Sequence, residues 1–527
     1  MATASPAQAK SPTAAPRQPD GAAIFVERRG LLTVAVMLAT IMQILDSTIA
    51  NVALPHMTTA LSASPDMISW VLTSYVVAVA IAMPITGWLA DRVGSRNLFL
   101  LSVAGFVAAS TLCGAAQDLT QMVMFRLVQG VTAAFMSPLG QTVLLDINPP
   151  ERQAKAMSIW GMGIMVGPIS GPVIGGWLTD NFDWRWVFYV NVPFGILCFA
   201  LLWWLLPSRP IVKRRFDIFG FALLSLTLAT FQLMLDRGQG KDWFTSTEVW
   251  IEALVAGSCA WMFVVHMITA RNPMFDRALF KNRNLITASA FMTVMSLVMM
   301  GTMAVLPTML QTVYGHSVQE TGLLLTSRGI SMVLMMVVTT QLTQRGIDVR
   351  LILATGFGIT AYSAWTMSHW SLDMGSGPVI LSGVIQGMGM GLLFMPVTAI
   401  AFGTLSPQHR TDASAVLNLS RSLGASVGIS VIVTLLARNQ QISHSDIAQH
   451  INDQTLPVDP NVLQALGGMG NAVMGMIDAE VNRQALMIAY LDDYWIMSII
   501  TACAIPLVLT LRKPKGPMVN DPGAAGH

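Results

Sequence analysis

Residues 31–54 read LLTVAVMLATIMQILDSTIANVAL, a stretch that is apolar except for small or uncharged polar residues and one charge, Asp46. A single α-helix needs about 20 predominantly apolar residues to cross the hydrocarbon core of a bilayer. The stretch therefore predicts a membrane-spanning helix that carries one carboxylate inside the membrane.

Thirteen further apolar runs follow it along the 527 residues, of which 53% are hydrophobic and only 11% are charged. Soluble domains carry about 25% charged residues. The sequence predicts an all-α membrane protein with fourteen transmembrane helices, and it excludes a cytosolic enzyme and, since no basic tract stands out, a nucleic-acid-binding protein. The expected spans are residues 31–54, 68–89, 98–117, 120–143, 156–178, 187–206, 217–235, 249–269, 285–312, 321–342, 351–368, 377–401, 413–437 and 494–511.

The distribution of Lys and Arg predicts the orientation of these spans. With the N-terminus inside, the inner segments hold 22 of these residues and the outer segments hold five, as the positive-inside rule requires. We therefore expect a multi-pass protein with both termini in the cytoplasm. Residues 1–29 are expected to be a disordered cytoplasmic tail, residues 512–527 a second tail, and residues 438–493 a long outer loop.

The sequence also repeats itself at a nearly constant offset, which indicates two six-helix bundles in parallel repeat. We place the N-terminal bundle at residues 30–207, two inserted transmembrane helices at 208–283 and the C-terminal bundle at 284–511. The matching pairs are residues 72–75 with 325–328, 53–55 with 305–307, and 129–130 with 386–387.

Four charges lie deep inside the predicted spans: Asp46, Arg126, Arg328 and Arg421. A charge at the bilayer centre costs about 2.5 to 3.5 kcal/mol on the lenient insertion scale, so such residues usually face a protein interior or an aqueous cavity. Asp46 and Arg126 lie at similar depth below the outer face and could pair, and Gln129 shares a helix face with Arg126. For Arg328 and Arg421, packing and a functional role in a cavity are both open.

The repeat aligns Asp46 with Val298, so only the N-terminal half is expected to carry an intramembrane carboxylate. A carboxylate that moves between a desolvated site and a site beside an arginine would load and release a proton. We predict this proton-coupling role for Asp46 and Arg126, against the alternative of a permanent structural ion pair. Methionines around Met332, Met335 and Met336 could line a cavity, although Met is more often core filler. The candidates for a substrate cavity are Gln43, Asn51, Gln129, Arg328 and Gln386.

The chain resembles the major facilitator superfamily from about Arg29 to Arg512, and within it the fourteen-span drug:proton antiporter family of EmrB-like and QacA-like exporters. Residues 45–55, LDSTIANVALP, are similar to the family's first-span signature, whose Asp is implicated in proton coupling, and residues 126–130, RLVQG, resemble the span-four motif. Residues 87–96, GWLADRVGSR, resemble the loop motif that acts as a conformational latch. The resemblance assigns Gly87, Asp91, Arg92, Gly94 and Arg96 to this latch, which Asn97, in place of a further basic residue, could weaken.

Residues 167–176, GPISGPVIGG, resemble the antiporter motif of span five, formed by Gly167, Pro168, Gly171, Pro172, Gly175 and Gly176. Glycines at intervals of four make one flat helix face for close packing, and prolines remove backbone donors so that a helix can bend. Residues 184–193 and 235–243 are further similar to the EmrB-like branch, and their aromatic residues also suit the membrane interface.

Together these features predict a proton-coupled secondary exporter of hydrophobic or amphipathic drugs that works by alternating access. An exporter of one endogenous metabolite, such as a siderophore, fatty acid or amino acid, is the nearest alternative, and a transport-dead membrane sensor is a weaker one. We expect no cofactor and no metal, because no Walker motif, CxxC pair or HExxH occurs and His266 is isolated. An enzyme is therefore not expected.

The resemblance further implies residence in the cell (inner) membrane, a role in antibiotic resistance, and the periplasmic adaptor and outer-membrane channel with which EmrB-like exporters work; QacA-like relatives act alone. The loop 438–493 contains three apolar clusters that could form short amphipathic helices on the outer leaflet or against another protein. We expect this loop to dock a partner, with a passive surface loop as the alternative. The clusters are residues 462–466, 473–477 and 485–489.

Overall fold

The computed structural model describes residues 24, 26–208, 211, 215–403, 405, 409–451 and 470–511, and in these ranges the chain is helical without strands. The N-terminal half contains α1 (Arg29–Ala60), α2 (Pro65–Ile68), α3 (Trp70–Ala82), η1 (Met83–Ile85), α4 (Thr86–Val93), α5 (Ser95–Ala115), α6 (Leu119–Ala133), α7 (Met136–Ile147), α8 (Pro150–Asn181), α9 (Trp186–Tyr189) and α10 (Asn191–Leu205). Then follow α11 (Ile218–Arg237), η2 (Gln239–Lys241), η3 (Trp243–Thr245), α12 (Thr247–Thr269) and α13 (Arg277–Lys281). The C-terminal half contains α14 (Arg283–Thr312), α15 (Val318–Gln344), α16 (Val349–Met367), α17 (Ser376–Gly403), α18 (Arg410–Gln449), α20 (Gly470–Cys503) and η5 (Pro506–Thr510).

The all-helical membrane class predicted from the sequence is confirmed, whereas the number of spans is not. Twelve helical segments in the described part of the chain are long and apolar enough to cross a membrane. Helices α8 and α16 occupy the fifth and eleventh predicted spans but are not among the twelve. Glycines and prolines in α8, and Arg350 in α16, dilute their apolar character, so fourteen spans remain a prediction.

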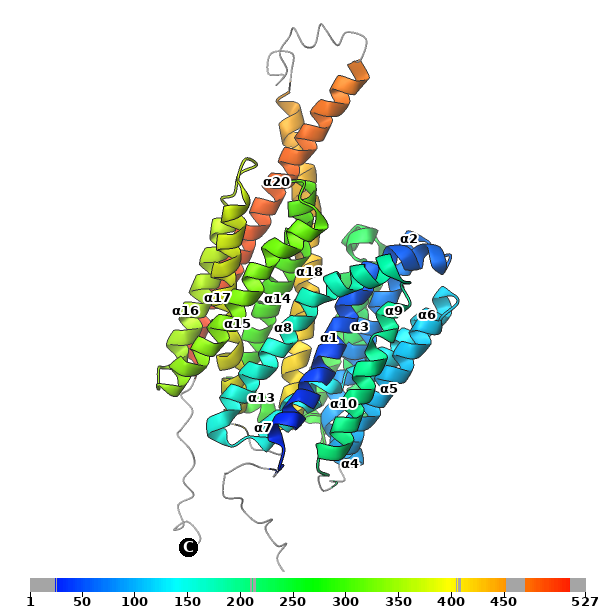
Figure 1. The fold of residues 1–527 in the computed structure, drawn as a ribbon, viewed down its shortest axis with the longest axis vertical. Coiled ribbons are helices and arrows are strands. Elements are labelled where there is room, and N and C mark those ends of the chain that lie inside the picture. Colours follow the sequence, from blue (N-terminus) through cyan, green and yellow to red (C-terminus); the bar gives the residue numbers. More distant parts are fainter. Residues whose placement is uncertain are drawn as a thin grey trace, which may run out of the picture.

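The two halves show the same pattern of helix packing (Figure 1). In the N-terminal half α1 packs on α8, α3 on α6, and α5 on both α6 and α10; in the C-terminal half α14 packs on α18, α15 on α17, and α16 on both α17 and α20. Each helix pair in one half has a counterpart in the other half, formed by the helices at the same positions in the chain order. The packing therefore follows the repeat seen in the sequence.

Side chains at helix starts fix where several spans begin. Asp118, Asp217 and Asp348 each accept a hydrogen bond from a backbone N–H in the first turn of α6, α11 and α16. Ser317 and Glu320 form a reciprocal capping box at the start of α15. These contacts satisfy donors that the first helical turn leaves without an intrahelical partner.

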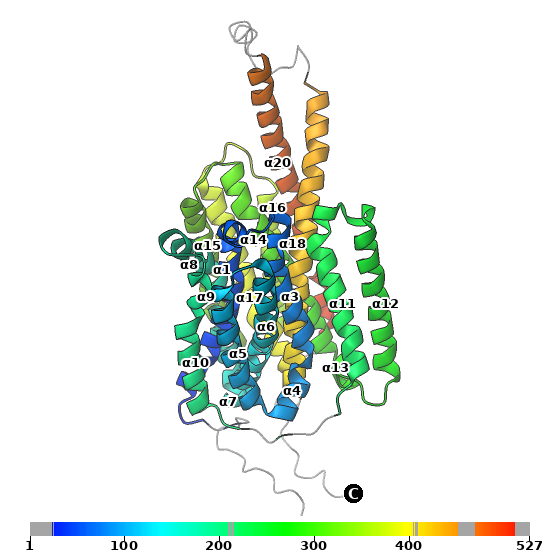
Figure 2. The ribbon, with the colours of Figure 1, turned by 90° about the vertical axis from the view of Figure 1, so that its right-hand side faces the viewer.

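Helices α11 and α12 stand together beside the two bundles, as Figure 2 shows. Helix α11 contacts α3 of the N-terminal half and α18 of the C-terminal half. The Ser430 hydroxyl of α18 donates to the Leu235 carbonyl at 2.7 Å, and the Trp243 indole donates to the Thr434 hydroxyl at 3.0 Å. Helix α11 and the turn after it therefore join both halves along one side of the molecule.

We call the face where α1 and α18 begin the basal face, and the opposite face the apical face. Residues Ile24 and Val26 pack at the basal face, where the Ile24 amide donates to the Asp146 carbonyl at 3.0 Å. Of the two predicted tails, residues 1–23, residue 25 and residues 512–527 lie outside the described residues.

On the apical side, α18 and α20 extend beyond the bundles as a helical pair (Figures 1 and 2). The prediction of short amphipathic helices in residues 438–493 is wrong where the structure describes them, since α18 runs on to Gln449 and α20 begins at Gly470 and continues into the bundle. Residues 473–477 and 485–489 are parts of this one helix, and Ala485 and Ala489 are buried in the bundle interior. The cluster 462–466 lies outside the described residues.

Candidate functional site

The Asp46 carboxylate lies at the centre of the N-terminal bundle, with none of its side chain exposed. Arg126 of α6 forms an ion pair with it at 2.7 Å between Nη1 and Oδ2. The amides of Gln129 and Asn191 donate to Oδ1 at 2.8 and 2.9 Å. The carboxylate thus accepts three hydrogen bonds, from two helices, and its charge is compensated.

Arg126 is held from several sides at once. Its Nε donates to the Val71 carbonyl of α3 at 3.0 Å, and Nη1 also donates to Gln129 Oε1 at 2.8 Å. The guanidinium stacks over the ring of Tyr75, with 4.3 Å from Cζ to the ring centroid, and lies 5.6 Å from that of Phe188. Since its side chain is also fully buried, the pair is sealed from solvent in this conformation.

Sequence reasoning placed Asp46, Arg126 and Gln129 near one another but missed Asn191. Asn191 opens α10 and also donates to Ser110 Oγ at 3.0 Å, while the Ser110 hydroxyl donates to the Phe188 carbonyl at 2.9 Å. The available signals were its place within residues 184–193, which resemble the EmrB-like branch, and its position as an amide at a span end. Such an amide is also common as an ordinary helix-terminal residue, so its role could not be read from the sequence.

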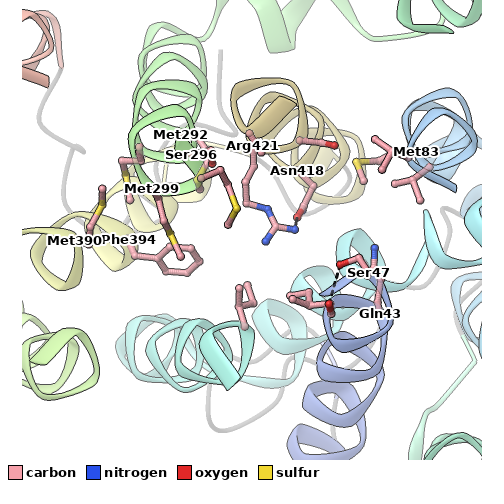
Figure 3. A pocket seen from close by; sticks show the side chains of 18 of the residues that line it. Gln43, Ser47, Met83, Met292, Ser296, Met299, Met390, Phe394, Asn418 and Arg421 are labelled. Carbon is pink, nitrogen blue, oxygen red and sulfur yellow. Dashed lines mark hydrogen bonds between the residues drawn. The ribbon is translucent and has the colours of Figure 1, made fainter. Parts of the chain in front are cut away.

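A cavity of about 220 Å³ lies between the two bundles. Its wall is formed by α1, α3 and η1, by α8, and by α14, α15, α17 and α18. Arg421 of α18 is the charged residue in this lining, which contains no Asp or Glu. In Figure 3, Arg421 extends between the methionines of α14 on one side and Gln43 and Ser47 of α1 on the other. Seven methionines line the cavity: Met83, Met292, Met295, Met299, Met300, Met332 and Met390.

Gln43 and Tyr75 connect this cavity to the Asp46–Arg126 pair. Both residues line the cavity. The Tyr75 hydroxyl lies 3.4 Å from the Gln43 carbonyl, to which it donates, and the Arg126 guanidinium lies over the same ring. The Gln43 side chain is held in turn by the Ser137 hydroxyl, which donates to Oε1 at 2.7 Å. One aromatic ring therefore touches both the cavity and the buried ion pair.

A polar cluster joins the two bundles on the basal side of the cavity. Arg410 of α18 forms an ion pair with Asp146 of α7 at 3.0 Å. The Ser414 hydroxyl and the Asn418 amide donate to Gln141 Oε1 of α7, the amide at 2.8 Å. Residues 410, 414 and 418 occupy successive turns of α18, and residues 418, 421, 422 and 425 line the cavity. The cluster therefore lies between the cavity and the basal face.

The five predicted cavity residues are not brought together. Gln43 lines the cavity, whereas Gln129 belongs to the Asp46 network and Asn51 is exposed near the apical end of α1. Arg328 and Gln386 lie inside the C-terminal bundle, where the Gln386 amide donates to Thr302 Oγ1 at 3.3 Å. Of the three methionines considered, only Met332 reaches the cavity; Met336 is buried against Gly161.

The predicted latch residues divide between two roles. Gly87 packs so closely on Asp412 of α18 that a Cβ at Gly87 would overlap the carboxylate. Gly94 has φ +91° at the turn between α4 and α5, a conformation that glycine adopts without strain. Arg92 stacks on Trp88, and Arg96 donates to the Trp203 carbonyl at 2.7 Å within the N-terminal bundle. Asp91 also lies on α4. Gly87 thus contacts the other bundle, while Arg92 and Arg96 brace their own.

The predicted glycine face of α8 lies against α1. A Cβ at Gly167 would lie 2.6 Å from Ile44, one at Gly171 would lie 2.1 Å from Thr48, and one at Gly175 would lie 3.3 Å from the Ile49 carbonyl. Gly176 has nothing within 4 Å of the same position. Helix α8 continues without a break through Pro168 and Pro172.

His266 is not isolated, contrary to the prediction. Its Nε2 lies 2.9 Å from both carboxylate oxygens of Asp217, and the Met274 amide donates to the same carboxylate at 3.1 Å. The contact ties the end of α12 to the start of α11, which sequence spacing could not reveal because the two residues are 49 positions apart. In the described part of the chain, no group of three or more His, Cys, Asp or Glu side chains could hold a metal ion.

Comparison with known proteins agrees with this geometry. Residues 36–429 match the model of the Major Facilitator Superfamily. The chain is 34% identical over 495 residues to the multidrug export protein EmrB of Escherichia coli K12, covering 92% of this chain and 96% of the relative. It is also 34% identical over 500 residues to the fatty acid resistance protein FarB of Neisseria gonorrhoeae, covering 94% and 97%. The solved proton:xylose symporter XylE has the same fold, with a TM-score of 0.59 at 13% identity over 91% of this chain and 95% of that one.

Proposed function

The chain belongs to the major facilitator superfamily and is an EmrB-like multidrug exporter rather than an enzyme, and we propose that it exchanges protons for hydrophobic or amphipathic compounds through the Asp46–Arg126 pair. The single observation that carries this mechanism is that Tyr75 both lines the cavity and stacks on the Arg126 guanidinium. A compound that displaces Tyr75 would disturb the ion pair without touching it.

The chemistry of coupling follows from the two states of Asp46. While Arg126, Gln129 and Asn191 hold it, the carboxylate is ionised and sealed. A movement that withdraws Arg126 leaves a buried carboxylate without a counter-charge, and the carboxylate then takes up a proton. Re-forming the pair expels that proton. Proton uptake and release are thus coupled to the geometry of α1, α3 and α6.

We place the basal face in the cytoplasm, a placement that the distribution of Lys and Arg supports. The structure then corresponds to a conformation closed toward the cytoplasm, since the Arg410–Asp146 ion pair and the Gln141 cluster lie between the cavity and that face. Alternating access would break these contacts, opening the cavity to the cytoplasm or the inner leaflet. The latch contact between Gly87 and Asp412 would separate in the same step.

The cavity lining supports substrates with an apolar body and an acidic or strongly accepting group. Methionine side chains are flexible and polarizable and adapt to different apolar shapes. Arg421 donates to Asn418 Oδ1 at 3.0 Å and has no acidic residue beside it in the lining. The same feature favours a second candidate function, export of long-chain fatty acids, in keeping with the name of the relative FarB.

Proteoliposomes with an imposed pH gradient test both proposals. Uptake of oleate and of the lipophilic cation tetraphenylphosphonium is measured, together with proton flux, for the native protein and for Arg421→Gln and Arg421→Lys. We expect gradient-driven oleate transport that is lost in Arg421→Gln and largely kept in Arg421→Lys. Transport that ignores the gradient would contradict proton coupling, and transport of the cation alone would contradict the anionic preference.

We also propose that the apical extension of α18 and α20 is where an adaptor protein docks outside the inner membrane, as the resemblance to EmrB-like exporters implies. Met474 and Met476 of α20 are 67% and 72% exposed there. Replacing both with Gln should lower drug resistance in cells that co-express the adaptor and leave liposome transport unchanged. Unchanged resistance would contradict docking through these side chains.

A further inference from the structure

The C-terminal bundle contains a buried carboxylate that the sequence did not reveal. Asp493 of α20 lies on the buried side of the helix together with Tyr490, Tyr494 and Met497, and its relative exposure is 0%. Because residues 438–493 were expected to form an outer loop, Asp493 was not counted among the intramembrane charges. The expectation that only the N-terminal half carries a buried carboxylate is therefore wrong.

Asp493 lies in the apical part of the C-terminal bundle. The hydroxyl of the next residue, Tyr494, donates to Met309 Sδ at 3.6 Å, and Met309 is three residues from the apical end of α14 at Thr312. Asp493 therefore lies toward the apical end of its bundle.

The surroundings of the two acids are opposite. Asp46 has an ion pair and two amide donors, whereas both oxygens of Asp493 are buried without a hydrogen-bond partner among the described residues. Apolar side chains of α14, α16 and α18, including Met309, Ala364 and Ile432, form one cluster with Tyr490, Tyr494 and Met497 of α20. An ionised carboxylate in such a place would keep its full desolvation penalty, and a proton removes that penalty.

No cation in the described part of the chain compensates Asp493. The ionisable groups near it are Asp492 and Tyr490 on its own helix, and Tyr494, which in turn lies within electrostatic reach of Tyr314 and of Arg328 on α15. Arg328 is half-buried, and its buried Nε and Nη2 atoms have no partner among the described residues. The C-terminal bundle therefore leaves Asp493 and Arg328 unpaired, while the N-terminal bundle pairs Asp46 with Arg126.

We propose that Asp493 is a second proton-binding carboxylate, which is protonated in this conformation while Asp46 is ionised. Asp493 lies toward the apical end of its bundle and Asp492 beside it is exposed, so the proton would come from the apical side. Its part in transport rests on the proposed exporter function, because a proton carried here would add to the one exchanged at Asp46. Proton binding itself does not depend on that function.

Infrared spectroscopy of the purified full chain in lipid nanodiscs tests the protonation directly. At neutral pH, the native protein should show the carbonyl stretch of a protonated carboxylic acid. This band should disappear in Asp493→Asn, which keeps the size of the side chain, and shift in frequency in Asp493→Glu. It should persist in the matched control Asp492→Asn, which removes an exposed acid from the same turn. Absence of the band in the native protein, or its persistence in Asp493→Asn, overturns the proposal.

The same variants separate proton binding from coupling. In proteoliposomes loaded with oleate, Asp493→Asn should exchange one proton fewer per oleate than the native protein, and Asp492→Asn should not differ from it. An unchanged ratio in Asp493→Asn overturns a role for this proton in transport. If no compound is transported at all, the exporter proposal fails, and the infrared band still decides whether Asp493 carries a proton.

Discussion

Gly171 offers the sharpest test of how closely α1 and α8 must approach. A Cβ added there would lie 2.1 Å from Thr48 Oγ1 and 2.8 Å from Thr48 Cβ, while contacts shorter than 3.4 Å are already tight. The overlap of about 1.3 Å must be relieved by moving Thr48 or separating the helices. Overpacking of this kind costs about 1 to 3 kcal/mol. Gly171→Ala should therefore lower both the thermal unfolding midpoint and the transport rate.

Gly176→Ala is the matched control for this change. Gly176 lies in the same helix but has nothing within 4 Å of the added Cβ. Both substitutions gain the same helix propensity of up to about 1 kcal/mol, so the difference between them reports packing alone. Two quantities are measured. Tryptophan fluorescence monitors thermal unfolding in detergent, and initial rates of gradient-driven transport are measured in proteoliposomes.

A second substitution identifies the contact that causes the loss. Thr48 donates to the Gly167 carbonyl at 3.2 Å, and Thr48→Ala removes this weak bond together with the closest clash. Thr48→Ala should restore part of the stability lost in Gly171→Ala but not all of it, because the Cβ remains too close. Equal stability and equal transport of Gly171→Ala and Gly176→Ala would refute the reasoning.

Three further outcomes are expected. Asp46→Asn should abolish proton-driven transport and lower the free energy of unfolding by about 3 to 5 kcal/mol, because it leaves Arg126 buried without a counter-charge. In chemical unfolding, the double variant Asp46→Asn, Arg126→Gln should regain much of that stability, but it should not regain transport. Proton-coupled transport by the double variant would contradict the mechanism. Arg126→Lys should keep part of the proton flux that Arg126→Ala loses, since Lys preserves the charge but not the planar fork that contacts Asp46, Gln129 and Val71. Arg410→Gln should weaken the basal closure, which labelling of a cysteine introduced beside the cavity with a membrane-impermeant thiol reagent from the basal side would detect; unchanged labelling would show that the Asp146 pair does not hold the closure.

The sequence predicts well those features that depend on position along one helix. Equal depth placed Asp46 opposite Arg126, because the rise of a helix converts residue number into height. The spacing of Gly167, Gly171 and Gly175 predicted a flat face by the same logic, although not that α1 would occupy it. The parallel repeat predicted which helices correspond in the two halves.

What depends on contacts between distant segments could not be predicted. Asn191 reaches Asp46 across 145 positions, and Asn418 reaches Gln141 across 277, and no local pattern encodes either approach. Asp493 was misplaced for a different reason. Polar residues before it suggested an outer loop, whereas helix α20 carries them on its exposed side and keeps Tyr490, Asp493 and Tyr494 on its buried side.

Helix α18 is one continuous rod of 40 residues, about 60 Å long, with Arg410 at its foot and the apical extension at its tip. A tilt of about 10° at the foot would sweep the tip through roughly 10 Å, so small rearrangements at the basal closure are magnified far from the membrane. The coupling also acts in the opposite direction, because a molecule bound to the tip of α18 resists the tilt and shifts the populations of the two conformations. An antibody fragment raised against the extension would accordingly act as a brake on the transport cycle while the cavity stays empty.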